Sequence, residues 1–152
     1  MKKRGIWLGI GVCLVLVAGL AVQRWSTATA QPLPQVAVVF LSGSYTVGES
    51  DGSVTITVTL SQASSSTVTV DYATSDGTAI STPATSADYH PASGTITFPP
   101  YSTSQTFTVI IFPDVCCEPT EAFTVTLSNP QGASIGIPDT TTVNILNDDT
   151  CP

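Results

Sequence analysis

Ser53-Val-Thr-Ile-Thr-Val-Thr-Leu60 is the stretch of this chain that decides its fold. Polar and branched apolar residues alternate along it one by one, which is the side-chain period of an extended strand. One face of the strand therefore carries four apolar side chains, those of Val54, Ile56, Val58 and Leu60. The opposite face carries only hydroxyl side chains. This pattern predicts a β-strand with one buried face.

The same alternation of polar and apolar residues recurs along the rest of the chain. No segment after residue 36 shows a helical period. Short runs rich in Val, Ile, Thr and aromatic residues are separated by Gly, Pro, Asn, Asp and Ser. We expect strands at residues 36–40 with a continuation at 45–47, and at 53–60, 67–74, 94–98, 105–112, 121–128 and 140–146. About seven such strands predict an all-β fold, an immunoglobulin-like antiparallel β-sandwich. Residues 75–91 form a loop too long to be a simple connection.

The first 30 residues have the pattern of an export segment. A basic start is followed by an apolar run over residues 5–22 and by Ala28-Thr29-Ala30, a small-x-small cleavage pattern. Two readings remain open, a cleaved signal peptide and an uncleaved N-terminal membrane anchor. Both place the remainder outside the cytoplasm, so we expect a secreted or cell-surface protein. Residues 31–35 then form a linker and residues 36–150 a single domain.

Three cysteines belong to this exported part, Cys116, Cys117 and Cys151. Disulfides persist outside the cytoplasm, whereas the absence of a Cys-x-x-Cys pair argues against a zinc site. We expect Cys151 to pair with Cys116 or Cys117. A vicinal bridge between the two adjacent cysteines is the alternative, because spacing alone does not set connectivity.

The charges of the chain are strongly segregated. No lysine or arginine follows Arg24, and all eleven acidic residues lie beyond it, from Glu49 to Asp149. Without its four basic residues, the formal charge changes from -7 to -11. Carboxylates about 6 Å apart repel by roughly 1–3 kcal/mol, and this domain has no basic side chains to offset the repulsion. Nucleic acid is excluded as a partner, since nothing here neutralises phosphates.

Most of the acids lie at the ends of predicted strands or in the adjoining loops, where the loops of a sandwich can meet. Calcium takes six to eight oxygen ligands, mainly carboxylates and carbonyls. The pattern therefore predicts bound Ca2+ at one end of the sandwich, with enough carboxylates for two or more ions. The candidate ligands are Glu49, Asp88, Asp114, Glu118, Glu121, Asp148 and Asp149.

Several motifs follow one another in the order of a known family. They are YTVGE (45–49), VDYATSDGTA (70–79), ADY (87–89), GTITF (94–98), EAFTVTLSN (121–129) and VNILNDD (143–149). From about residue 36 to residue 149 the chain resembles a Calx-beta domain, the calcium-binding repeat of sodium/calcium exchangers and integrin β4. The resemblance implies calcium binding at one end of the sandwich, with ligands at the same seven positions. Asp76 fits a structural role in its turn instead.

The chain departs from the family pattern in two places. Calcium-binding members of the family often carry a run of acidic residues before the position of Asp114, where this chain has Phe112-Pro113. Asn147 replaces the first acidic residue of the terminal cluster. Fewer carboxylates imply fewer or weaker ion sites. The adjacent cysteines lie inside the ligand loop, so a bridge to Cys151 would tie that loop to the terminal acids.

An enzyme is not expected. A glycosidase needs a substrate cleft beside its paired carboxylates, and the aromatic residues here are scattered. His90 is the single histidine, and Asp88-Tyr89-His90 lacks a serine motif such as Gly-x-Ser-x-Gly. The sequence favours an exported calcium-binding module with a structural or adhesive role, whose partner is a cell-surface protein or polymer. A metal-free module with vestigial sites is the alternative.

Overall fold

The computed structural model describes residues 35–83 and 86–150. The predicted export segment and Cys151 lie outside these ranges. Within the described residues no helix is long and apolar enough to cross a membrane. The residues in these ranges form strands and loops, with a single turn of 3-10 helix, η1 (Glu49–Asp51).

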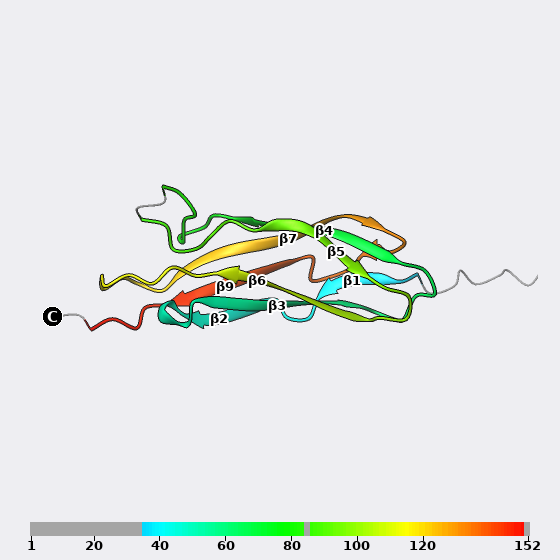
Figure 1. The fold of residues 1–152 in the computed structure, drawn as a ribbon, viewed down its shortest axis with the longest axis horizontal. Coiled ribbons are helices and arrows are strands. Elements are labelled where there is room, and N and C mark those ends of the chain that lie inside the picture. The colour runs from blue at the N-terminus through cyan, green and yellow to red at the C-terminus, as the bar shows by residue number, and fades with distance from the viewer. Residues whose placement is uncertain (1–34, 84–85, 151–152) are drawn as a thin grey trace, which may run out of the picture. The chain divides into compact units, whose positions relative to one another are not determined.

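The described part of the chain forms two β-sheets (Figure 1). The four-stranded sheet has the order β6-β3-β1-β8, and the five-stranded sheet has the order β2-β9-β7-β4-β5. The strands are β1 (Ala37–Phe40), β2 (Ser44–Gly48), β3 (Ser53–Leu60), β4 (Val68–Ser75), β5 (Ser93–Phe98), β6 (Ser104–Ile110), β7 (Glu121–Gln131), β8 (Ser134–Ile135) and β9 (Thr140–Leu146). The predicted all-β sandwich is confirmed.

Two details differ from the prediction. The first expected strand and its continuation belong to different sheets, since β1 pairs with β3 and β2 pairs with β9. The pairs β1–β8 and β2–β9 are parallel, so the sandwich is not purely antiparallel. The two-residue strand β8 was not predicted because two residues are too few to show a period.

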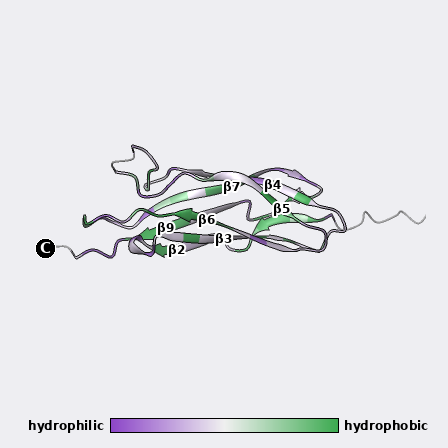
Figure 2. Ribbon diagram, viewed as in Figure 1, coloured by the Kyte–Doolittle hydropathy of each residue, from purple (hydrophilic) through white to green (hydrophobic). Residues whose placement is uncertain are grey.

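The core lies between the sheets and is built from the apolar face of each strand. In β3, Ile56 and Val58 are completely buried, whereas Ser53 and Thr55 on the opposite face are exposed. In Figure 2 the hydrophobic colour follows strands such as β7 and β9, and the segment after β9 is hydrophilic. The alternation that predicted the strands therefore also predicted which of their residues form the core.

The pairing registers bring several strand ends together at one end of the sandwich. Ser53 at the start of β3 pairs with Ile110 at the end of β6. Glu121 at the start of β7 pairs with Ile145 near the end of β9. The long loop between β4 and β5 joins the same end, because Phe112 N donates to Asp88 O at 2.9 Å. In Figure 1 this is the end that carries the C-terminus of the described chain.

Candidate metal centre

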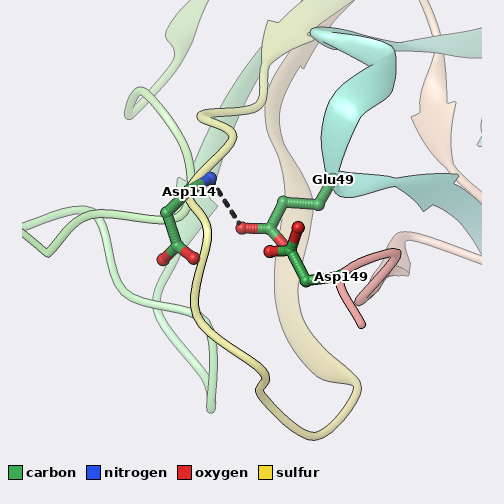
Figure 3. Close-up of side chains that lie close together, drawn as sticks. All are labelled: Glu49, Asp114 and Asp149. Atoms are coloured by element: carbon green, nitrogen blue, oxygen red, sulfur yellow. Dashed lines mark hydrogen bonds between the residues drawn. The ribbon is translucent and has the colours of Figure 1, made fainter. Parts of the chain in front are cut away.

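A first group of carboxylates contains Glu49, Asp114 and Asp149, and we call it cluster 1 (Figure 3). Each residue offers one carboxylate oxygen, and the three oxygens lie within 4.8 Å of one another. Glu49 is only 7% exposed. The backbone N of Asp114 donates to Glu49 Oε1 at 3.0 Å, which fixes the loop after β6 against η1. Three segments far apart in sequence thus meet around a buried carboxylate.

Local sequence explains why Glu49 is held in place. Asp51 Oδ2 accepts a hydrogen bond from Gly48 N at 2.7 Å and so closes the single turn of η1. Gly52 then leaves the turn with φ of 75°, a left-handed conformation that glycine adopts without strain. The turn therefore presents Glu49 to the end of the sandwich.

A second group contains Asp88, Glu118 and Glu121, and we call it cluster 2. Its three carboxylate oxygens also lie within 4.8 Å of one another, and all three residues are half-buried. A small pocket is lined by this cluster together with Glu49, Pro119, Ile145 and Asn147. Because Glu49 belongs to cluster 1, the pocket lies where the two clusters adjoin.

The site contains an oxygen atom without a partner. Asp149 Oδ2 is buried and has no hydrogen-bond donor among the described residues. A buried unpaired carboxylate oxygen is costly, and the sequence has no lysine or arginine after Arg24 to pair with it. The two clusters offer oxygen ligands without sulfur or nitrogen, which is the donor set that Ca2+ prefers. The residues present therefore fit a hard divalent cation.

Asp148 is the one predicted ligand outside both clusters. Its Oδ2 accepts a hydrogen bond from Ser50 N at 3.3 Å and another from the Ser50 hydroxyl. It therefore holds η1, and through η1 it helps to position Glu49. A role for Asp148 as a ligand stays a prediction.

Asn147 links the two clusters, a role that was missed in the sequence. Its Oδ1 accepts a hydrogen bond from Glu118 N at 3.3 Å, and its Nδ2 donates to Asp149 O at 3.1 Å. The signal was present in the period-2 pattern, which continues beyond β9. Residues 145, 147 and 149 are buried or half-buried, whereas 146 and 148 are exposed.

A family model described as the Calx-beta domain matches residues 34–149. The chain belongs to the Calx-beta family. The resemblance of the sequence motifs to this family is thereby confirmed.

This Calx-beta domain is similar to parts of much longer proteins. It is 33% identical over 115 residues to the sodium/calcium exchanger Calx of Drosophila melanogaster, a match that covers 75% of this chain and 12% of the exchanger. It is 32% identical over 143 residues to sodium/calcium exchanger 1 of Canis lupus familiaris, covering 82% of this chain and 14% of that protein. The chain thus spans a small fraction of the relatives it matches.

Solved structures show the same relationship. The apo-form Calx CBD1 domain superposes with a TM-score of 0.70 and 33% identity, covering 76% of this chain and 99% of that one. The calcium binding domain CBD12 of CALX1.1 also gives a TM-score of 0.70 and 33% identity, covering 76% of this chain and 47% of that one. The Calx CBD2 domain, at 19% identity and a TM-score of 0.67, shares the fold.

Burial and mutual repulsion perturb the carboxyl groups of this Calx-beta domain. Burial raises the pKa of Glu121 to about 7, and its hydrogen bond with Asp88 and the charges of Asp88, Glu118 and Glu49 add to the rise. Burial likewise raises the pKa of Glu49, where the backbone N–H of Asp114 partly opposes it. Glu49 and Glu118 thus interact across the boundary between the clusters.

The cysteines of the Calx-beta domain lie beside cluster 1. Cys116 is a free, exposed thiol, so the alternative of a vicinal bridge was wrong. Its backbone N donates to Asp114 Oδ1 at 2.6 Å. Cys117 is disulfide-bonded. Its expected partner, Cys151, lies outside the described residues, so a Cys117–Cys151 bridge stays a prediction.

Proposed function

We propose that this Calx-beta domain binds calcium ions at the end of the sandwich where the two clusters lie. The observation that carries the proposal is the buried Asp149 Oδ2, which has no donor among the described residues and belongs to a group of three converging carboxylates. A cation is the partner that such an oxygen lacks. The name of a similar solved structure, a calcium binding domain at 33% identity, supports the same ion.

The proposed ligands divide between two ions. Glu49, Asp114 and Asp149 hold one ion, and Asp88, Glu118 and Glu121 hold the other. Three carboxylates supply part of a calcium coordination shell, and backbone carbonyls and water complete it. Asp148 holds η1 through Ser50 and thereby supports Glu49.

The proposed context is that of an exported, non-catalytic module. The basic and apolar N-terminal sequence supports export, with a secreted or cell-surface location. A structural or adhesive role follows from fold-level analogy, with a cell-surface protein or polymer as the partner. The competing proposal is a domain that keeps the fold without binding metal.

Calorimetric titration of the domain with CaCl2 separates these two proposals. We expect a dissociation constant of about 10⁻⁴–10⁻³ M, as in extracellular modules. We also expect stabilisation by about 2.7 kcal/mol when free calcium is a hundredfold above that constant. Heat and melting temperature that do not change up to 10 mM CaCl2 would show a metal-free module.

Two substitutions with the same change of charge make the test specific. Asp149→Asn removes a proposed ligand and should weaken binding by about tenfold or more. Asp139→Asn is the matched control, because Asp139 is exposed and immediately precedes the opposite end of β9. Equal effects of the two substitutions would show that net charge, and not the cluster, attracts calcium.

A further inference from the structure

A buried tyrosine lies next to a carboxylate of cluster 2. Tyr89 directly follows Asp88 and is only 1% exposed. Its ring stacks on Phe123 with centroids 4.0 Å apart and planes 11° from parallel. Its backbone pairs with Ile111 in an isolated β-bridge. The ring and the backbone are therefore both held by the core, and the hydroxyl has a fixed position.

The tyrosine hydroxyl is hydrogen-bonded to an acid that belongs to neither cluster. Tyr89 Oη donates to Asp76 Oδ1 at 2.5 Å, and the same oxygen accepts a hydrogen bond from Ser81 N at 3.0 Å. Burial, followed by the bond to Asp76, raises the pKa of Tyr89 to about 12. The hydroxyl therefore remains a donor at neutral pH. Asp76 connects the core to the loop after β4.

The loop then returns to Asp88 through the residue before Ser81. Ile80 N donates to Asp88 Oδ2 at 2.6 Å, and Asp88 N donates to Ile80 O at 2.9 Å. Tyr89, Asp76, Ser81, Ile80 and Asp88 thus form a closed circuit of hydrogen bonds and adjacent residues. One oxygen of the Asp88 carboxylate is oriented by a backbone amide whose own position depends on this circuit.

The same loop supports the strand that carries Glu121. Ala79 N donates to Ala122 O at 2.9 Å, and Ala122 N donates to Thr78 Oγ1 at 2.8 Å. Gly77 lies so close to the backbone of Ala122 that a Cβ on residue 77 would be 2.4 Å from Ala122 O. The loop is therefore bonded to Asp88 of cluster 2 and docked on Ala122, the residue next to Glu121.

We propose that the Tyr89–Asp76 hydrogen bond positions the Asp88 carboxylate, and with it the calcium site of cluster 2. Tyr89 and Asp76 are positioning residues that act through Ile80 and Ser81 and do not touch the ion. The inference rests on the proposed calcium binding. Loss of such a supporting partner commonly weakens metal binding by 10- to 100-fold. Within the described residues, no hydrogen bond joins the circuit to a carboxylate of cluster 1, so cluster 1 should keep its affinity.

The test is a calcium titration of Tyr89→Phe followed by amide NMR, with one set of signals from each cluster. Phe keeps the ring that stacks on Phe123 and removes only the hydroxyl. We expect affinity at cluster 2 to fall by about tenfold or more, with cluster 1 unchanged within twofold. Asp76→Ala, at an exposed position, should reproduce the result and replaces Tyr89→Phe if that variant does not fold.

Tyr45→Phe is the matched control. The Tyr45 hydroxyl contacts Thr57 N at 3.1 Å and Thr57 O at 3.3 Å, so it also makes polar contacts in a part-buried place. Tyr45 lies on β2, and its hydrogen bonds reach Thr57 and Asn144 and none of the described residues of the loop after β4. Loss of this hydroxyl should leave calcium affinity at cluster 2 unchanged. An equal loss in Tyr45→Phe and Tyr89→Phe, or equal losses at both clusters, would overturn the positioning role.

Amide hydrogen exchange tests the hydrogen-bond circuit even if the domain binds no calcium. If the unchanged protein binds no calcium, the proposed function fails, and the circuit is tested in the metal-free protein. The amides of Ile80 and Ser81 should then exchange at least tenfold faster in Tyr89→Phe than in the unchanged protein. Unaltered exchange of both amides would refute the inference independently of calcium.

Discussion

Replacing Glu121 by Gln should stabilise the metal-free domain and weaken calcium binding. Burial and the neighbouring carboxylates raise the pKa of Glu121 from 4.5 to about 7 in the folded protein. The folded state therefore favours the protonated form, and its stabilising effect is lost as pH rises through about 7. At pH 8 Glu121 is ionised in both states, so the folded state carries the full cost of the buried charge.

The size of this cost follows from the pKa. A change from 4.5 to about 7 corresponds to at most about 3–4 kcal/mol. Solvent screening at a half-buried group reduces this to about 1–2 kcal/mol. Gln has nearly the same shape and no charge, so metal-free Glu121→Gln should melt about 4–8 °C higher at pH 8. At pH 4.5 the difference should nearly vanish, because Glu121 is then protonated in the folded protein.

The assay is thermal unfolding of both proteins in EDTA at pH 8 and at pH 4.5, repeated with CaCl2 at pH 8. With calcium, Glu121→Gln should melt at a lower temperature than the unchanged protein, because Gln is a weaker ligand than a carboxylate. Asp139→Asn again serves as the control for net charge. If metal-free Glu121→Gln is less stable than the unchanged protein at pH 8, the carboxylate has a structural role and the reasoning is refuted.

Three further outcomes are expected. Asn147→Ala should weaken calcium binding at both clusters and cost about 1 kcal/mol of stability; calorimetry that shows a loss at one cluster alone would contradict its linking role. Non-reducing peptide mapping should find Cys117 joined to Cys151 and Cys116 open to alkylation, and a bridged Cys116 would contradict the structure. Gly77→Ala should destabilise the domain by about 1–3 kcal/mol in urea unfolding, whereas an unchanged midpoint would show that the loop is not docked as described.

The fold was predictable because its dominant signal is local. The alternation of polar and apolar residues in β3 indicates which face of the strand is buried. The same period-2 pattern recurs in β7 and β9. The division of the first strand between two sheets was not predictable in the same way. That division depends on whether β1 and β2 pair with β3 or with β9, and such pairings join residues far apart in sequence.

The gathering of acids at one end was also predictable, but their grouping was not. The structure places six of the seven predicted residues in two clusters. Glu49 meets Asp114 and Asp149 because η1, the loop after β6 and the end of β9 adjoin there, and strand registers set that arrangement. The Asp148 side chain points away from cluster 1, because adjacent residues of an extended chain, here Asp148 and Asp149, face opposite sides.

The composition of the domain explains why protons would compete with the proposed cations at this end. Carboxylates that converge within 4.8 Å repel one another, and the chain supplies no lysine or arginine after Arg24 to offset the repulsion. The metal-free domain can relieve the repulsion by protonation, as the pKa of about 7 at Glu121 indicates. The proposed divalent cation would relieve it without protonation and would also partner the buried Asp149 oxygen. The same burial that makes these carboxylates costly in the metal-free state would therefore favour a cation.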